Sequence, residues 1–286
     1  MGENRARDFG RLHGRFLTQI NQVAFAVPTR DRINLLGIDI DNVTFHETLI
    51  KIESLIENRK PSFIVTTNVD HLITLQEDSD FRKIYKQAAL AVPDGVPLLW
   101  AARFLGTPLK ERVAGSDLFP AVCQLAAEKG HRLFFLGGRS NVADKAKSAM
   151  ERRWPKIRIS NAYSPPFGFE TDPKEIERIC SMIKRSRPDI LFVSLGAPKQ
   201  ERFIFKYKDV LDIPFSMGIG ISFDFVAGTT KRAPSWMQKL GLEWFSRLLA
   251  EPRRLFRRYL IRDMQFFKLV YLQRKRMGHE MPSQGS

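Results

Sequence analysis

The sequence contains little cysteine, only scattered histidine and no long hydrophobic run. Its two cysteines, Cys123 and Cys180, lie in helix-like segments far apart in the chain of 286 residues. We therefore expect free thiols in a reducing compartment rather than a disulfide framework. The five histidines lack the spacing of a zinc site. No apolar segment approaches the roughly 20 residues that a membrane-spanning helix requires, so a cytoplasmic location is expected, with any membrane contact peripheral.

The dinucleotide-binding fingerprint GxGxxG is also missing. The stretches FFLGGRSN and GIGISFDF place glycines directly after apolar runs, but neither has the required spacing. A nucleotide-binding oxidoreductase thus remains an alternative that lacks its main signature. Gly137 and Gly138 still predict a close approach of the backbone to a phosphate, because a helix is expected directly after them. A plain strand-to-helix connection explains the same pair equally well.

Acidic residues are scarce near the C-terminus. The formal net charge is +15, and between Trp244 and Arg276 ten lysines and arginines face only two acids, Glu251 and Asp263, so this stretch holds +8 of it. The excess is local and describes a surface rather than a fold. A nucleic-acid-binding module is the alternative that such charge invites. Its basic residues would be expected on a groove-sized helix or an aromatic sheet face, so no nucleic-acid partner is expected.

The sequence does contain a regular alternation of apolar runs and amphipathic segments. Runs of about four to eight residues predict strands, and the 3.6-residue periodicity between them predicts helices. This alternation is typical of βαβ units, so we expect an α/β fold with a mostly parallel, Rossmann-like sheet and helices on both faces. The expected strands are 34–40, 62–67, 90–96, 132–138, 157–163, 189–196 and 215–220. The expected helices are 46–59, two runs that end at residue 89, 98–106, 116–130, 142–154 and 173–186.

Composition divides the chain into four parts. Residues 1–31 are mixed, polar and basic and predict a loosely ordered extension, and residues 32–242 form the expected α/β core. Residues 243–276 predict a basic, amphipathic helical appendage, and residues 277–286 a disordered tail. Whether the protein forms a homo-oligomer is left open.

Polar residues gather where the expected strands end. Ligands of open parallel sheets bind at the carboxyl ends of the strands, so these residues outline a pocket. Asp94 lies there in a tight turn, and the chain offers no nucleophile elbow, so a general base is the natural role for this carboxylate. A turn aspartate that caps its own backbone is the alternative. The strand-end residues are Thr66, Thr67, Asn68, Asp94, Gly95, Gly137, Gly138, Gly196–Gln200, Gly218, Gly220 and Asp224.

Two DxD patterns raise the question of a metal–diphosphate site. One spans Asp39–Asp41 within a strand-like alternation, and the other spans Asp78–Asp80. Two matches in one chain show how little this short pattern specifies. We expect no metal ion and no other cofactor.

The C-terminal segment has two parts, because Pro252 cannot continue a preceding helix. Beyond it, apolar residues recur at helical spacing on one side and arginines on the other. A helix packed on the core with a solvated basic face is one interpretation. Enrichment in arginine and aromatic residues favours the other, an interfacial helix that contacts an anionic membrane surface. The apolar positions are Phe256, Leu260, Met264, Phe267 and Tyr271, and the basic positions are Arg254, Arg258 and Arg262.

Stretches between residues 33 and 272 resemble, in order, the WecG/TagA/CpsF family of bacterial glycosyltransferases. They are VTTNVDHL, PDGVP, ERVAGSDL, FFLGG, SLGAPKQE, GIGISFDFVAG, KRAPSWMQKLGLEW and RLLAEPRRLFRRY. The resemblance implies an inverting, metal-independent transfer of a sugar from a UDP-sugar to an undecaprenyl-diphosphate-linked sugar. It places the reaction at the inner face of the cell membrane, in the synthesis of cell-surface polysaccharides.

The resemblance also implies roles for individual residues. It places the catalytic base at Asp94, and it predicts substrate binding by the Gly137–Gly138 turn and by strand-end and loop side chains. The expected substrate-binding side chains are Thr66, Asn68, Arg112, Gln200 and Asp224. The arginines expected to meet the lipid diphosphate are Arg247, Arg254 and Arg257.

One departure from the family pattern bears on the donor sugar. Many members have Ala before the catalytic Asp and a small or apolar residue after the next Gly, whereas this chain has Pro93 and the pair Val96–Pro97 around Asp94–Gly95. The sequence here is more similar to the exopolysaccharide branch of the family. It favours a glucose-type donor over N-acetylmannosamine.

Overall fold

The computed structural model describes residues 31–239, 242–250, 256 and 262–280. The chain divides into the units Met1–Asp31 and Arg32–Ser286, and every helix and strand given below belongs to the second unit. Apart from Asp31, the predicted extension 1–31 lies outside the described residues.

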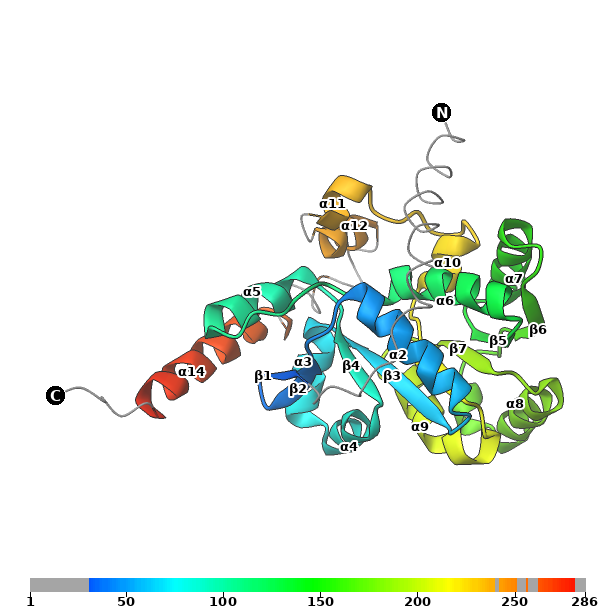
Figure 1. The fold of residues 1–286 in the computed structure, drawn as a ribbon, viewed down its shortest axis with the longest axis horizontal. Coiled ribbons are helices and arrows are strands. Elements are labelled where there is room, and N and C mark those ends of the chain that lie inside the picture. Colours follow the sequence, from blue (N-terminus) through cyan, green and yellow to red (C-terminus); the bar gives the residue numbers. More distant parts are fainter. Residues whose placement is uncertain (1–30, 240–241, 251–255, 257–261, 281–286) are drawn as a thin grey trace. The chain divides into compact units, whose positions relative to one another are not determined.

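A six-stranded parallel sheet in the order β4-β3-β8-β7-β5-β6 confirms the predicted fold class (Figure 1). Thr67 pairs with Pro93 on one side of the sheet, and Gly137 pairs with Ser194 on the other. Because all neighbours are parallel, the residues that follow the strands meet at one edge. The strands are β3 (Ser62–Thr67), β4 (Leu90–Pro93), β5 (Arg132–Gly137), β6 (Arg158–Tyr163), β7 (Ile190–Ser194) and β8 (Phe215–Gly218).

Helices cover both faces of the sheet, as expected for strands that are apolar on both sides. In β5, Leu133 and Phe135 belong to one hydrophobic cluster, and Phe134 and Leu136 belong to the other. The first cluster includes α2 (Phe45–Glu57), α6 (Gly115–Lys129), α7 (Val142–Arg153) and α10 (Ser222–Val226). The second includes α3 (Val69–Glu77), α4 (Ser79–Gln87), α5 (Val96–Leu105), α8 (Pro173–Ser186), α9 (Lys199–Leu211) and α14 (Gln265–Glu280). A short 3-10 helix, η1 (Phe169–Thr171), precedes α8.

The single strand expected at 34–40 is wrong, because this segment is an antiparallel hairpin. Its strands are β1 (Arg32–Leu35) and β2 (Ile38–Asp41), which form a separate two-stranded sheet. Leu36 and Gly37 turn the chain with positive φ angles of 54° and 78°. Glycine adopts this conformation without steric cost, which allows the tight turn.

The C-terminal helix α14 packs on the core with one face. Phe266 and Val270 are buried in the second hydrophobic cluster. Gln273 accepts a hydrogen bond from Leu36 N at 2.9 Å and donates to a carbonyl of the hairpin, while Arg274 Nη1 donates to the last carbonyl of α5 at 3.0 Å. The helix continues past residue 276, the predicted end of the appendage, to Glu280. The shorter helices α11 (Ser235–Lys239) and α12 (Glu243–Ala250) lie before it in the chain.

Candidate active site

The ends of β3 and β4 bring Thr66 and Asp94 together. Asp94 N donates to Thr67 O at 2.7 Å, which fixes the turn after β4. Gly115, at the start of α6, donates its N–H to Asp94 Oδ2 at 3.1 Å. A Cβ atom on Gly115 would lie 3.3 Å from Thr66 Oγ1 and 3.7 Å from Asp94 Oδ2. The small residue therefore allows α6 to approach both side chains.

The pKa of the Asp94 carboxyl group is raised toward neutral pH. Burial raises the pKa of its carboxyl group to about 6, while the Gly115 N–H and the positive charge of Arg112 act in the opposite direction. The charges of Glu243 and Asp117 raise the pKa further. A carboxylate whose pKa lies close to neutral pH can accept a proton during a reaction and release it afterwards.

Arg112 lies at this end of the site, held by two carboxylates. Its Nη2 lies 3.1 Å from Asp117 Oδ2, and its Nη1 lies 3.5 Å from Glu243 Oε2. The side chain is 22% exposed, so its charge is only partly screened by water. A fixed, partly shielded guanidinium can stabilise a developing negative charge.

Asn68 follows β3 and has a structural role that the sequence left unpredicted. It is the N-cap of α3, and its Oδ1 accepts a hydrogen bond from His71 N at 3.0 Å. Such caps satisfy an N–H group that has no partner within the helix. Asn68 therefore fixes the start of α3 next to the Thr66 end of the site.

Gln200 belongs to a buried polar cluster at the ends of β7 and β8. Its Nε2 donates to Glu201 Oε1 at 2.7 Å, and its Oε1 accepts from Gly220 N at 3.0 Å. His71 joins the cluster through its Nε2, which lies 4.0 Å from Glu201 Oε1, and its Nδ1 lies 2.7 Å from the Tyr85 hydroxyl oxygen. Burial raises the pKa of Glu201 to about 7, and burial also raises the pKa of Tyr85 well above its ordinary value.

The amide group of Gln200 is held on both sides and packs closely on β8. A Cβ atom on Gly218 would lie 2.5 Å from Gln200 Nε2, a distance that side chains do not tolerate. Within the part of the chain that the structure describes, Glu201 Oε2 is buried without a hydrogen-bond partner. Glu201 and Gly220 thus orient Gln200, which connects the loop after β7 to the loop after β8.

The Gly137–Gly138 turn lies close to the backbone of β7, and its predicted approach to a phosphate stays a prediction. A Cβ atom on Gly137 would lie 2.3 Å from Ser194 O, and Gly138 N donates to the same oxygen at 2.7 Å. The positive φ angles of 110° and 79° are accessible to glycine. The Gly138 amide is therefore already engaged within the sheet edge.

Asp224 organises the turn that follows α10. Its backbone carbonyl accepts from Thr229 N at 3.0 Å and Thr230 N at 3.3 Å, and its Oδ1 accepts from Thr229 Oγ1 at 3.2 Å. The backbone and the side chain of this buried residue therefore both bind the loop at residues 229–230.

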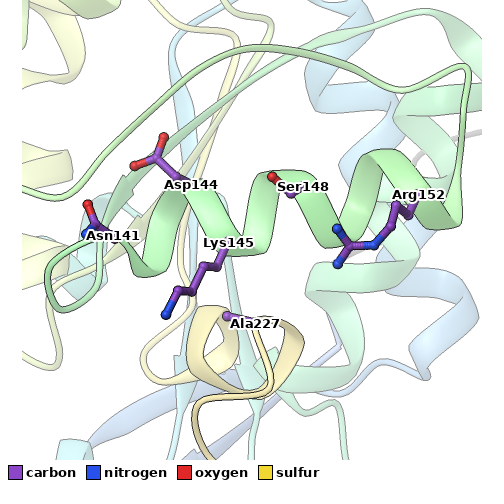
Figure 2. A pocket seen from close by; sticks show the side chains of 6 residues that line it. All are labelled: Asn141, Asp144, Lys145, Ser148, Arg152 and Ala227. Atoms are coloured by element: carbon purple, nitrogen blue, oxygen red, sulfur yellow. The ribbon is translucent and has the colours of Figure 1, made fainter.

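A surface groove of about 440 Å³ runs along α7, where Lys145 lies toward Ala227 (Figure 2). None of the predicted site residues lines this groove. Its lining side chains are exposed, apart from the half-buried Ala227. The lining residues are Asn141, Asp144, Lys145, Ser148, Arg152 and Ala227.

The first DxD pattern lies in the hairpin. Asp41 Oδ2 accepts from Ala91 N at 2.7 Å and its Oδ1 from Arg32 Nε at 3.2 Å, while Asp39 Oδ1 accepts from Asn34 Nδ2 at 2.8 Å. These contacts connect β2 to β1 and β4. Among the described residues, no three His, Cys, Asp or Glu side chains gather in a way that could hold a metal ion. Within the same ranges, no helix has the length and hydropathy of a membrane span.

Of the three arginines predicted to contact a lipid diphosphate, only Arg247 has its backbone within the described residues. Arg247 lies in α12, but its side chain is outside the described part of the structure, and Arg254 and Arg257 lie outside it entirely. Their role stays a prediction.

Several residues that the sequence left unassigned surround the predicted ones. All except Tyr85 lie inside a stretch that carries the family resemblance, often next to a residue already singled out, and that proximity is the signal that the sequence offers. Charge or burial at the site becomes visible only in the fold. The residues are His71, Tyr85, Asp117, Glu201, Arg232 and Glu243.

Comparison with known proteins identifies the family. Residues 33–280 match the model of the glycosyl transferase WecG/TagA/CpsF family. An N-acetylglucosaminyldiphosphoundecaprenol N-acetyl-beta-D-mannosaminyltransferase of Bacillus spizizenii is 35% identical over 199 residues, which cover 70% of this chain and 75% of the relative. A protein of the same name from Staphylococcus aureus is 30% identical over 228 residues, 79% of this chain and 87% of the relative. The chain therefore belongs to the WecG/TagA/CpsF family and is a glycosyltransferase.

Proposed function

We propose that the protein transfers a hexose or N-acetylhexosamine from a UDP-sugar to an undecaprenyl-diphosphate-linked sugar during the synthesis of a cell-surface polysaccharide. The observation that carries the proposal is Asp94, a carboxylate at the carboxyl edge of the sheet with a pKa of about 6. The Bacillus and Staphylococcus relatives are named for an acceptor in which N-acetylglucosamine is linked to diphosphoundecaprenol.

The proposed reaction is a single displacement. Asp94 takes the proton from an acceptor hydroxyl group while that oxygen forms a bond to the anomeric carbon of the donor. The bond from this carbon to the diphosphate oxygen breaks, and the electron pair leaves with UDP. Attack opposite the leaving group inverts the anomeric centre. Arg112 stabilises the charge on the departing diphosphate, and the reaction requires no second carboxylate as a nucleophile.

The remaining predicted residues have positioning or binding roles in this proposal. Thr66 and Asn68 line the side of the site next to Asp94, and Gln200 lines the side at β7 and β8. Asp224 holds the loop after α10. The Gly137–Gly138 turn shapes the edge at β5, where its glycines allow the approach of β7.

Two observations favour different donor sugars. The names of the relatives favour an N-acetylmannosamine donor, whereas the residues around Asp94 favour a glucose-type donor. Both sugars belong to the class proposed here. Neither requires a different set of catalytic residues.

A donor screen tests the function. Purified protein is incubated with UDP-glucose, UDP-N-acetylmannosamine and related UDP-sugars, with and without a short-chain polyprenyl-diphosphate-N-acetylglucosamine acceptor. We expect acceptor-dependent release of UDP with one donor, and a product heavier by one sugar in mass spectrometry. If the acceptor increases UDP release with none of the donors tested, the proposal is contradicted.

We also propose that the protein works at the anionic inner surface of the cell membrane, which holds the lipid acceptor. Two helices distant in sequence support this, because α5 and α14 pack side by side (Figure 1). Trp100 and Phe104 of α5 are 53% and 51% exposed, and Phe267 and Tyr271 of α14 are 47% and 61% exposed. Exposed aromatic residues beside cations suit a lipid interface. The exposed cations on these helices are Arg103, Lys268, Arg274, Lys275 and Arg276.

In this proposal the acceptor diphosphate is contacted by Arg247, Arg254 and Arg257. The membrane part is tested by flotation with anionic liposomes in the presence of a DNA competitor. We expect Trp100→Ser/Phe104→Ser and Phe267→Ser/Tyr271→Ser to float less than the wild-type protein. Val210→Ser, at an apolar position of α9 that is 52% exposed, is the matched control. Equal loss of flotation in the control, or release by DNA alone, contradicts a lipid surface.

A further inference from the structure

Four charged side chains form a closed network beside Asp94. Arg112 precedes α6, Asp117 lies in its first turn, Arg232 follows α10 and Glu243 begins α12. Arg112 contacts Asp117 at 3.1 Å and Glu243 at 3.5 Å. Arg232 Nη1 lies 2.6 Å from Asp117 Oδ1, and its Nε lies 3.1 Å from Glu243 Oε1. Each arginine thus contacts both carboxylates, and the charges alternate in sign around the ring.

The ring is partly shielded from water. The side chains of Glu243 and Arg232 are 20% and 23% exposed. The Arg232 guanidinium carbon lies 6.0 Å from the ring centroid of Phe225, and its Nη2 is buried without an acceptor among the described residues. Shielded ion pairs differ from exposed ones, because loss of one partner leaves a charge poorly solvated and unpaired. Removal of Glu243 would therefore affect both arginines.

The ring is coupled to Asp94 through the backbone of α6. Gly115, whose N–H donates to Asp94 Oδ2, lies in sequence between Arg112 and Asp117. Arg232 and Glu243 hold this segment from another part of the chain. A change in the ring would therefore move both the guanidinium of Arg112 and a hydrogen-bond donor of Asp94.

The charges of the ring also act directly on the base. Arg112 lowers the pKa of Asp94, whereas Glu243 and Asp117 raise it. Tyr85 of α4 also interacts electrostatically with Asp94. Burial raises the pKa of Tyr85 well above its ordinary value, so its side chain is an uncharged phenol at neutral pH. The charged side chains that act on Asp94 thus include Arg112, Glu243 and Asp117 of the ring.

We propose that Arg232 and Glu243 are positioning residues of the active site, whose ion pair fastens α12 to the segment that carries Arg112. The inference rests on the proposed function, in which Asp94 is the base and Arg112 stabilises the diphosphate. Arg232 and Glu243 act on the reaction through these two residues. The first turn of α12 is consequently part of the catalytic apparatus.

Opposite changes in pH dependence follow from opposite charges. Since ionised Asp94 is the active form, kcat/KM rises with pH through the pKa of this residue. Glu243→Gln removes a negative charge that raises this pKa, so the midpoint moves to lower pH. Arg232→Met leaves the two carboxylates with one counter-ion fewer, so the midpoint moves to higher pH. Both variants misplace Arg112, and we expect kcat/KM at the optimum to fall about tenfold.

The experiment measures kcat/KM against pH for the wild-type protein, Glu243→Gln and Arg232→Met. Glu53→Gln is the matched control, because Glu53 pairs at 2.5 Å with Lys129 at the other end of α6. We expect its midpoint and its kcat/KM to equal those of the wild-type protein. Unchanged midpoints in both ring variants, or an equal shift in the control, overturn the inference.

Charge-conserving variants keep the test decisive if a neutral variant does not fold. Glu243→Asp and Arg232→Lys retain the charges but cannot span both contacts, so kcat/KM should fall while the midpoint stays in place. Wild-type kcat/KM in both overturns the inference. Asp94→Asn separates the two proposals: if it retains activity, the proposed base is wrong. If it is inactive while the ring variants keep wild-type midpoints, only the positioning role is wrong.

Discussion

Two carboxyl groups at the same sheet edge have different surroundings. Asp94 follows β4, is partly exposed and lies beside the charged ring that includes Arg112. Glu201 lies in the first turn of α9, is 2% exposed and has Gln200 as its hydrogen-bond partner. Burial raises the pKa of both groups, to about 6 for Asp94 and about 7 for Glu201. A raised pKa alone therefore does not identify a base, because the group must also reach the substrate.

The different surroundings of Asp94 and Glu201 lead us to expect different roles for them. In the proposed reaction Asp94 exchanges a proton with the acceptor hydroxyl group, and the neighbouring cation Arg112 favours its ionised form. Glu201 is enclosed and suits the neutral acid, in which it fixes the amide of Gln200. We expect the loss of the first group to remove catalysis and the loss of the second to change stability.

Asp94→Asn should have the largest effect on turnover. The amide cannot accept the proton, so kcat should fall about 10² to 10⁴-fold, while binding of the UDP-sugar is retained. Because the folded state raises the pKa of Asp94, ionisation destabilises it as the pH rises through about 6. The variant should therefore melt at a higher temperature than the wild-type protein at pH 7.5. Calorimetry and steady-state kinetics measure the two results, and near-wild-type turnover would exclude Asp94 as the base.

Glu201→Gln should change stability far more than turnover. The stability that protonated Glu201 contributes is fully present below its unfolded pKa, near 4.5, and is lost as the pH rises through about 7. Glutamine resembles the protonated acid and avoids this loss, so the variant should be more stable at pH 8, by up to about 3 kcal/mol. Urea unfolding at pH 5 and pH 8 measures the difference, which should shrink at pH 5. A difference independent of pH would contradict a neutral Glu201.

Gly218→Ala should affect catalysis moderately through Gln200. The new methyl group would lie 2.5 Å from Gln200 Nε2 and would displace an amide that Glu201 and Gly220 hold. We expect kcat/KM to fall about tenfold with no change in the pH midpoint that Asp94 sets. Gly278→Ala is the control, because a Cβ atom there has no neighbour within 4 Å. Equal activity in the two variants would show that Gln200 has no part in the reaction.

Chelation should have the smallest effect. Neither Asp94 nor Glu201 needs a metal ion in the proposed reaction, so activity should be unchanged after treatment with EDTA. Asp39→Ala should likewise leave turnover unchanged and act only on the hairpin through the lost 2.8 Å contact with Asn34. Loss of activity in EDTA that Mg²⁺ or Mn²⁺ restores would contradict this prediction.

The C-terminal helix α14 packs on the core, as one of the two interpretations of the sequence expected, while its contact with a membrane stays a prediction. Phe267 and Tyr271 are exposed, as the predicted stripe requires, but Phe266 and Val270 are buried in the core. Arg262 of the predicted basic stripe contacts Asp70 Oδ1 at 3.0 Å rather than facing only solvent. Periodicity defined a face of the helix, whereas only the fold shows which neighbour each face meets.

The α/β class follows from local sequence patterns, because the apolar period of each segment indicates whether it is strand or helix and which side is buried. The same logic located Asp94, since a turn after a parallel strand lies at the binding edge whatever the helices do. Which side chains contact one another in the site follows only from the tertiary structure. Glu243 contacts Arg112 from a distant part of the chain, and Gly137 allows the close approach of Ser194. Ion pairs and close backbone contacts depend on distances between remote segments, and no local pattern of residues encodes those distances.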